Sequence, residues 1–168
     1  AVAGNRIARG ERVALFMEGG DLVAYAGRES PSTGRAIQPA ERGEDLAVTD
    51  LQGIVALHPG RITLLRIPSV ADGGSRVVEL ERARKALRRV DADIVGALDL
   101  PAKALANKLR VRVDIRFGVM AAAIDAAERG LDVALIVSED RVAAVVSAIE
   151  EANERLSQKI AYQTSAVA

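Results

Sequence analysis

The sequence contains no cysteine and no tryptophan, and its single histidine is His58. The absence of cysteine excludes disulfides and thiolate-bound metals, and one histidine cannot supply a zinc motif with two histidine ligands. We therefore expect no metal site and no cofactor. Aromatic residues make up only 2% of the chain, so its core must be built from alanine, valine, leucine and isoleucine.

The chain also lacks an excess of charge and a long apolar run. Lysine plus arginine and aspartate plus glutamate balance at 23 each, which argues against a dedicated nucleic-acid domain, because such domains usually carry a basic excess. No apolar run reaches the roughly 20 residues of a membrane span, and no signal-peptide pattern opens the chain. These features predict a cytoplasmic protein without membrane contact. The first residue is alanine rather than methionine, so we expect a piece of a longer protein.

Hydrophobic residues (49%) and charged residues (27%) are in the proportion of a globular chain. Residues 1–60 are rich in glycine, and their apolar residues come in short bursts. The segment "RVALFMEGGDLVAYAG" predicts two strands joined by a hairpin at Gly19-Gly20. We expect a small β-rich region here, either a barrel or an open sheet.

From residue 61 to residue 168 the pattern changes to alternating strands and helices. This alternation predicts an α/β domain with a five-stranded, mainly parallel sheet and helices on both faces. A flavodoxin-like strand order, 2-1-3-4-5, is the expected arrangement. The expected strands are residues 62–67, 94–98, 111–117, 131–138 and 159–167.

Two glycine-bearing turns follow expected strands of this domain, "PSVADGGSR" (68–76) and "RFGVM" (116–120). Each contains an arginine and leads toward a helix, whose N-terminus favours anions. In a flavodoxin-like sheet both turns would lie at the crevice where ligands bind. We therefore predict a small anionic ligand here, bound by Ser69, Asp72, Gly73, Gly74, Ser75, Arg76, Arg116, Phe117 and Gly118. The alternative is a tight turn in which Ser75 caps the helix and Glu79 completes a capping box.

Signals for catalysis are weaker. Ser138, Glu139 and Asp140 follow an expected strand, where they would suit either a reactive site or the start of a helix. No nucleophile with a partner base is recognisable, so we predict no catalytic residue, and the absence of enzymatic activity is favoured without being settled. A basic cluster on the expected helix is interpreted as its solvated face; it comprises Arg82, Arg84, Lys85, Arg88 and Arg89.

Three segments together resemble the C-terminal region of archaeal winged helix-turn-helix transcriptional regulators. They are "GERVALFMEGGDLVAYA", "ERGEDLAVTDLQGIVALHPGRITLLRIPSVADGGSRVVEL" and "FGVMAAAIDAAERGLDVALIVSED". In that group a DNA-binding head precedes a region with a Gly-Glu-Asp turn, an "IPS…GGSR" segment and an "FG…AAI" segment. The helix-turn-helix head itself is not in these 168 residues.

The resemblance implies an effector-sensing and dimerising region of a transcriptional regulator. Its expected partners are a small anionic molecule and a second copy of the chain, with DNA contacted only through the helix-turn-helix segment absent here. The apolar residues of the last helix, Val142, Val145, Val146 and Ile149, would suit either a dimer contact or packing on the sheet. Two alternatives stay open: a small α/β enzyme acting on a phosphorylated or carboxylated metabolite, and a structural assembly domain without a ligand.

Overall fold

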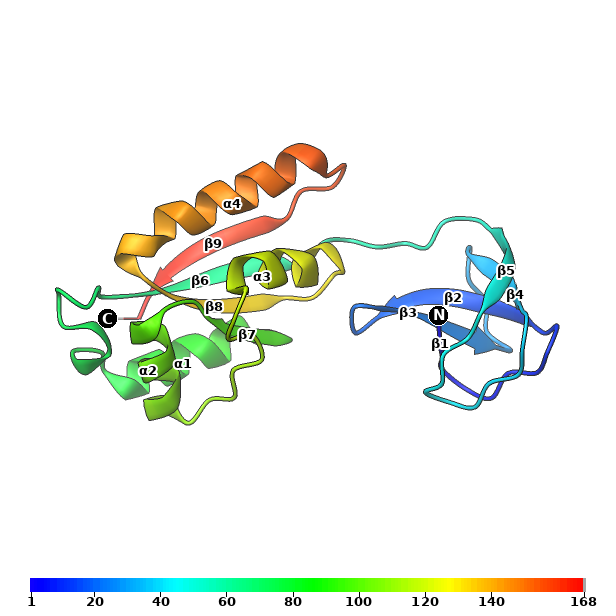
Figure 1. Cartoon of the computed structure of the whole chain (residues 1–168), viewed down its shortest axis with the longest axis horizontal. Helices are drawn as coiled ribbons and strands as arrows, with labels where there is room; N and C mark the ends of the chain where they lie inside the picture. Colours follow the sequence, from blue (N-terminus) through cyan, green and yellow to red (C-terminus); the bar gives the residue numbers. More distant parts are fainter. Residues whose placement is uncertain (168) are drawn as a thin grey trace. The chain divides into compact units, whose positions relative to one another are not determined.

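The computed structural model describes residues 1–167 and divides the chain into two compact units, Ala1–Leu57 and His58–Ala168. Residues 53–60 between them lie outside helices and strands (Figure 1). The sequence placed the boundary after residue 60. Each unit has hydrophobic core clusters of its own.

The N-terminal unit is a five-stranded, mostly antiparallel sheet in the order β1-β3-β2-β4-β5. The turn between β2 and β3 is the predicted hairpin: Glu18 pairs with Asp21, and Gly19 and Gly20 both have positive φ, as a two-residue type I′ turn requires. Backbone hydrogen bonds from Ala3 to Glu44 and from Leu46 to Ala1 link the β1 end of the sheet to the segment before β5. The strands are β1 (Val2–Ala3), β2 (Arg12–Glu18), β3 (Asp21–Ala26), β4 (Thr33–Ala36) and β5 (Val48–Gln52).

The C-terminal unit is a parallel α/β fold with a four-stranded sheet in the order β7-β8-β6-β9. Its strands are β6 (Arg61–Ile67), β7 (Ile94–Ala97), β8 (Val133–Ser138) and β9 (Ala161–Ala166). Its α-helices are α1 (Leu80–Val90), α2 (Leu100–Leu109), α3 (Val119–Glu128) and α4 (Val142–Arg155), and two short 3₁₀ helices, η1 (Gly74–Arg76) and η2 (Glu139–Arg141), precede α1 and α4.

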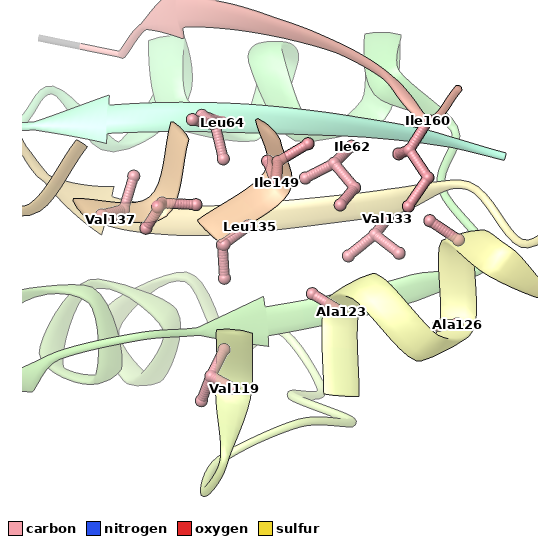
Figure 2. Close-up of a cluster of buried hydrophobic side chains, with 12 residues drawn as sticks. Ile62, Leu64, Val119, Ala123, Ala126, Val133, Leu135, Val137, Ile149 and Ile160 are labelled. Atoms are coloured by element: carbon pink, nitrogen blue, oxygen red, sulfur yellow. The ribbon is translucent and has the colours of Figure 1, made fainter. Parts of the chain in front are cut away.

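Helices cover both faces of this sheet, as predicted (Figure 1). Alternate residues of β8 point to opposite faces: Leu135 joins the core cluster of α3 and α4, and Ile136 joins that of α1 and α2. Figure 2 shows the first cluster, with Leu135 beside Ile149 of α4 and Ala123 of α3 among the buried side chains. Every residue of β8 is buried, as expected for a central strand of a parallel sheet covered on both sides.

The flavodoxin-like order was wrong. It would place β7 next to β6, whereas β8 lies between them. β8 is the most apolar strand, so placing it between two strands and two helix layers removes the most apolar surface from water. The polar strand β9, with Gln163, Thr164 and Ser165 exposed, lies at the edge of the sheet.

The expected third strand, 111–117, is not a strand of the sheet. It makes a single parallel bridge, Gly96 with Ile115, beside β7. The Asp114 carboxylate accepts a 3.0 Å hydrogen bond from the backbone N–H of Val95, and the Val95 carbonyl accepts from the N–H groups of both Asp114 and Ile115. The Asp114 side chain thus accepts the hydrogen bond that a backbone carbonyl of a paired strand would accept, and regular strand pairing with β7 ends there.

The apolar residues of α4 pack inside the C-terminal unit. Val145 and Ile149 are buried in the core cluster of α3 and α4, and Val142 and Val146 pack against it. Packing on the sheet, rather than a dimer contact, therefore accounts for these side chains.

Candidate functional site

The carboxyl ends of β6, β7 and β8 lie at the same edge of the sheet, and Asp99 joins two of them. Its carboxylate caps α2 by accepting from the backbone N–H of Ala102 at 3.0 Å. The same carboxylate accepts from Ser138 at the end of β8, from the backbone N–H at 3.0 Å and from the hydroxyl at 2.5 Å. The start of α2 is therefore held firmly at this edge.

The glycine turn after β6 uses its N–H groups internally. Gly73 donates to the carbonyl of Val70 at 3.2 Å, and Gly74 donates to the carbonyl of Ser69 at 2.7 Å. The hydroxyl of Ser69 donates to the Asp72 carboxylate at 2.6 Å. Ser69, Asp72, Gly73 and Gly74 thus build the turn, and the two glycine N–H groups are not directed at a ligand.

Ser75 does not cap α1, because η1 separates the turn from the helix and Glu79 occupies the cap position. Glu79 makes no capping hydrogen bond through its side chain, so the expected capping box does not form. Ser75 is buried, and its carbonyl accepts a 2.7 Å hydrogen bond from Nζ of Lys108 in α2. Lys108 therefore fastens the glycine turn to α2.

An apolar hollow of about 200 Å³ lies between this turn and the first turns of α2. Val70 (64% exposed) and Leu100 (77% exposed) lie on its two sides, and Arg76 supplies its charged group. Its lining consists of Val70, Gly73, Gly74, Ser75, Arg76, Leu100, Pro101 and Ala104.

The second predicted turn borders a separate hollow of about 420 Å³, lined by Leu98, Lys103, Arg116, Phe117, Gly118, Val119, Met120 and Ala121. Phe117 is 85% exposed, and Nζ of Lys103 lies 4.9 Å from the centre of its ring. The two hollows share no lining residue, but both border the start of α2. The predicted site residues are therefore divided between two hollows and do not form one crevice.

Two of the three residues considered for catalysis, Ser138 and Glu139, have side-chain partners, whereas exposed Asp140 has none among residues 1–167. Ser138 is bound to Asp99, and Glu139 forms a 2.9 Å ion pair with Arg66. His58 lies in the exposed connection before β6, with Nδ1 at 3.2 Å from Oε1 of Gln158. Over residues 1–167, no group of three His, Cys, Asp or Glu side chains is placed to hold a metal ion.

A third feature was missed by sequence reasoning. Arg82, Lys85 and Arg89 of α1 line a groove of about 540 Å³ together with polar residues of the sheet, Thr63, Gln163 and Ser165. From the sequence, these cations are expected to form a solvated helix face. The signal that could have found the groove is their spacing of three and four residues, which places all three on one side of the helix.

In the described residues, no helix is long and apolar enough to cross a membrane. The chain is 29% identical over 152 residues to Uncharacterized protein MJ0558 of Methanocaldococcus jannaschii, an alignment that covers 90% of this chain. The chain spans 58% of that relative's length. No solved structure matches the chain. The model of the family described as a domain of unknown function, DUF7839, matches residues 56–156, and the chain belongs to this family.

Proposed function

We propose that this chain is the effector-sensing region of a transcriptional regulator, and that its C-terminal unit binds a small anionic effector at the glycine-turn hollow. One observation carries the proposal: the guanidinium-bearing Arg76 and an apolar lining border the same hollow. Ligand sites are typically apolar with a few polar groups that fix orientation. The expected effector is a small molecule with an apolar body and a carboxylate or phosphate that pairs with Arg76.

The lining of the hollow supports this choice of ligand. Val70 and Leu100 expose most of their side-chain surface, and a ligand that covers them removes apolar area from water. Arg76 is exposed and has no ion pair in the described residues. Arg116 and Lys103 border the neighbouring hollow, where they would attract a larger anionic ligand.

In this proposal, effector binding is sensed through the start of α2. The helix borders both hollows; its N-terminus is tied to β8 through Asp99, and its last turn is tied to the glycine turn through Lys108. A ligand that contacts both the turn and α2 would favour one arrangement of these elements. DNA binding belongs to a winged helix-turn-helix segment outside these residues, and the working state is a homo-oligomer.

The test is a thermal-shift and calorimetric screen of carboxylates, amino acids and phosphate esters on the full chain and on Arg76→Ala. A ligand at about 100 times its dissociation constant stabilises the folded state by about 2.7 kcal/mol. We expect a stabilising ligand whose effect disappears in Arg76→Ala and persists in Arg88→Ala, which removes an exposed arginine of α1 outside the hollows.

Two results would contradict the proposal and favour its alternatives. Turnover of a phosphorylated or carboxylated metabolite that is lost in Glu139→Gln, with folding intact, would favour an enzyme. Concentration-dependent stability without any ligand effect would favour an assembly domain. The ion pair of Glu139 with Arg66 gives that carboxylate a structural role, so the enzyme alternative has less support.

A further inference from the structure

The groove between α1 and β9 lies on the face of the sheet that α1 and α2 cover. The pairing of Gln163 with Thr63 and of Ser165 with Leu65 places these β9 side chains on that face. Gln163 and Ser165 remain exposed there, so the helices leave β9 uncovered. One wall of the groove is thus α1, and its floor is the polar edge of the sheet.

Three cations form the helical wall. Arg82, Lys85 and Arg89 are exposed and line the groove. None of their side chains has a hydrogen bond or an ion pair in the described residues. By contrast, Arg84 of the same helix is paired with Glu81. Like charges three and four residues apart disfavour a helix slightly, so this arrangement favours a bound anion that compensates them.

The floor adds hydrogen-bonding groups. Thr63 is buried, and its Oγ1 accepts a 3.1 Å hydrogen bond from Nε2 of Gln163. The carbonyl oxygen of that amide and the hydroxyl of Ser165 have no hydrogen-bond partner in residues 1–167. They are available to hydroxyl or amine groups of a ligand, while the cations take its charge.

We propose that this groove binds a small molecule with more than one phosphate group. The three cations extend over about 10 Å of helix, a length that a single phosphate does not cover. The groove of about 540 Å³ is within the roughly 300–1,000 Å³ range of small-molecule sites. The zero net charge of the chain argues against a nucleic acid as occupant.

This site is distinct from the effector site proposed above, because the glycine-turn hollow and the groove have no lining residue in common. Either proposal can therefore fail alone. Arg76→Ala is expected to leave the groove unchanged, and substitutions in the groove are expected to leave the effector response unchanged.

The experiment is calorimetric titration of the full chain with tripolyphosphate and with ATP at low ionic strength. Arg82→Gln and Arg89→Gln should each weaken binding about tenfold, because each removes one charged hydrogen-bonding partner. Glutamine keeps a high helix propensity, so α1 should remain folded, which circular dichroism can check. Arg88→Gln is the matched control: it removes the same charge from an exposed position of the same helix outside the groove.

Gln163→Ala tests the floor without changing any charge. It should weaken ATP more than tripolyphosphate, since only ATP has ribose and base groups to reach the floor. Three results would overturn the proposal: no binding of either probe, equal weakening by Arg88→Gln and Arg82→Gln, or tighter binding of a single-stranded oligonucleotide than of ATP. The second would indicate only diffuse charge attraction, and the third would make the groove a nucleic-acid surface.

Discussion

The hydroxyl of Ser138 donates a 2.5 Å hydrogen bond to Oδ2 of Asp99, across 39 residues of sequence. Through this bond and the backbone N–H of the same serine, one carboxylate connects the end of the central strand β8 to the start of α2. Because α2 borders both candidate hollows, the position of these sites depends on this contact.

Replacing Asp99 with alanine should destabilise the C-terminal unit by about 2–4 kcal/mol. The change removes a helix cap, which is worth about 1 kcal/mol, and leaves the buried hydroxyl and N–H of Ser138 unsatisfied. Urea denaturation measures the loss. Ser138→Ala is the control and should cost less, about 1 kcal/mol, since the cap of α2 remains. Equal losses in the two variants would contradict this account.

Gly60→Ala should also destabilise the C-terminal unit strongly. An added Cβ would lie 2.0 Å from the carbonyl oxygen of Leu131, so the backbone must shift at a cost of about 3 kcal/mol. Gly118→Ala is the comparison, because Gly118 has a φ of 58° with open space around it, and only left-handed strain of about 1–2 kcal/mol is expected there. A smaller denaturation midpoint change for Gly60→Ala than for Gly118→Ala would refute the close contact.

Both tyrosines of the chain should titrate above the ordinary tyrosine range. The hydroxyl of Tyr25 donates to Glu18 and that of Tyr162 donates to Glu150, each at 2.7 Å, and these bonds raise the pKa of both phenols above 10.0. Since the folded pKa is raised, the associated stabilisation is present below pH 10 and is lost as the pH rises through the raised value.

Absorbance titration in alkaline solution measures this effect. Glu18→Ala should lower the pKa of Tyr25, because the hydrogen bond and the negative charge disappear while the Arg28 cation, which lowers that pKa, stays over the ring. Tyr162 should be unaffected in this variant and serves as an internal reference. Two unchanged titrations would show that the Glu18 contact does not form in solution.

Limited proteolysis should first cut the connection between the two units. Residues 53–60 lie outside helices and strands, and Ile54 is 84% exposed. Thermolysin, which cleaves before aliphatic residues, is expected to cut at Ile54 and to release two resistant fragments, since each unit has its own buried core. Initial cleavage inside α1 or β9 would instead indicate that the C-terminal unit opens locally.

The sequence by itself determined the local elements. The Gly19-Gly20 pair specified a hairpin, because both residues adopt positive φ without a steric cost. The apolar period of residues 75–90 predicted a helix, of which residues 80–90 form α1, and the apolar run of residues 131–138 predicted the strand β8. The hairpin, the helix and the strand each depend on residues that are close together in the sequence.

Only the tertiary structure decided which strands are neighbours, and the strand order in turn decided which residues come together in each hollow and in the groove. Placing β8 between β6 and β7 put the two predicted turns around α2 in separate hollows, and the Asp114 carboxylate kept residues 111–117 from becoming a fifth strand. Placing β9 beside β6 set Gln163 and Ser165 opposite the cations of α1. Sequence periodicity shows which face of an element is apolar, but the partner of that face is chosen by competition among all buried surfaces of the folded chain.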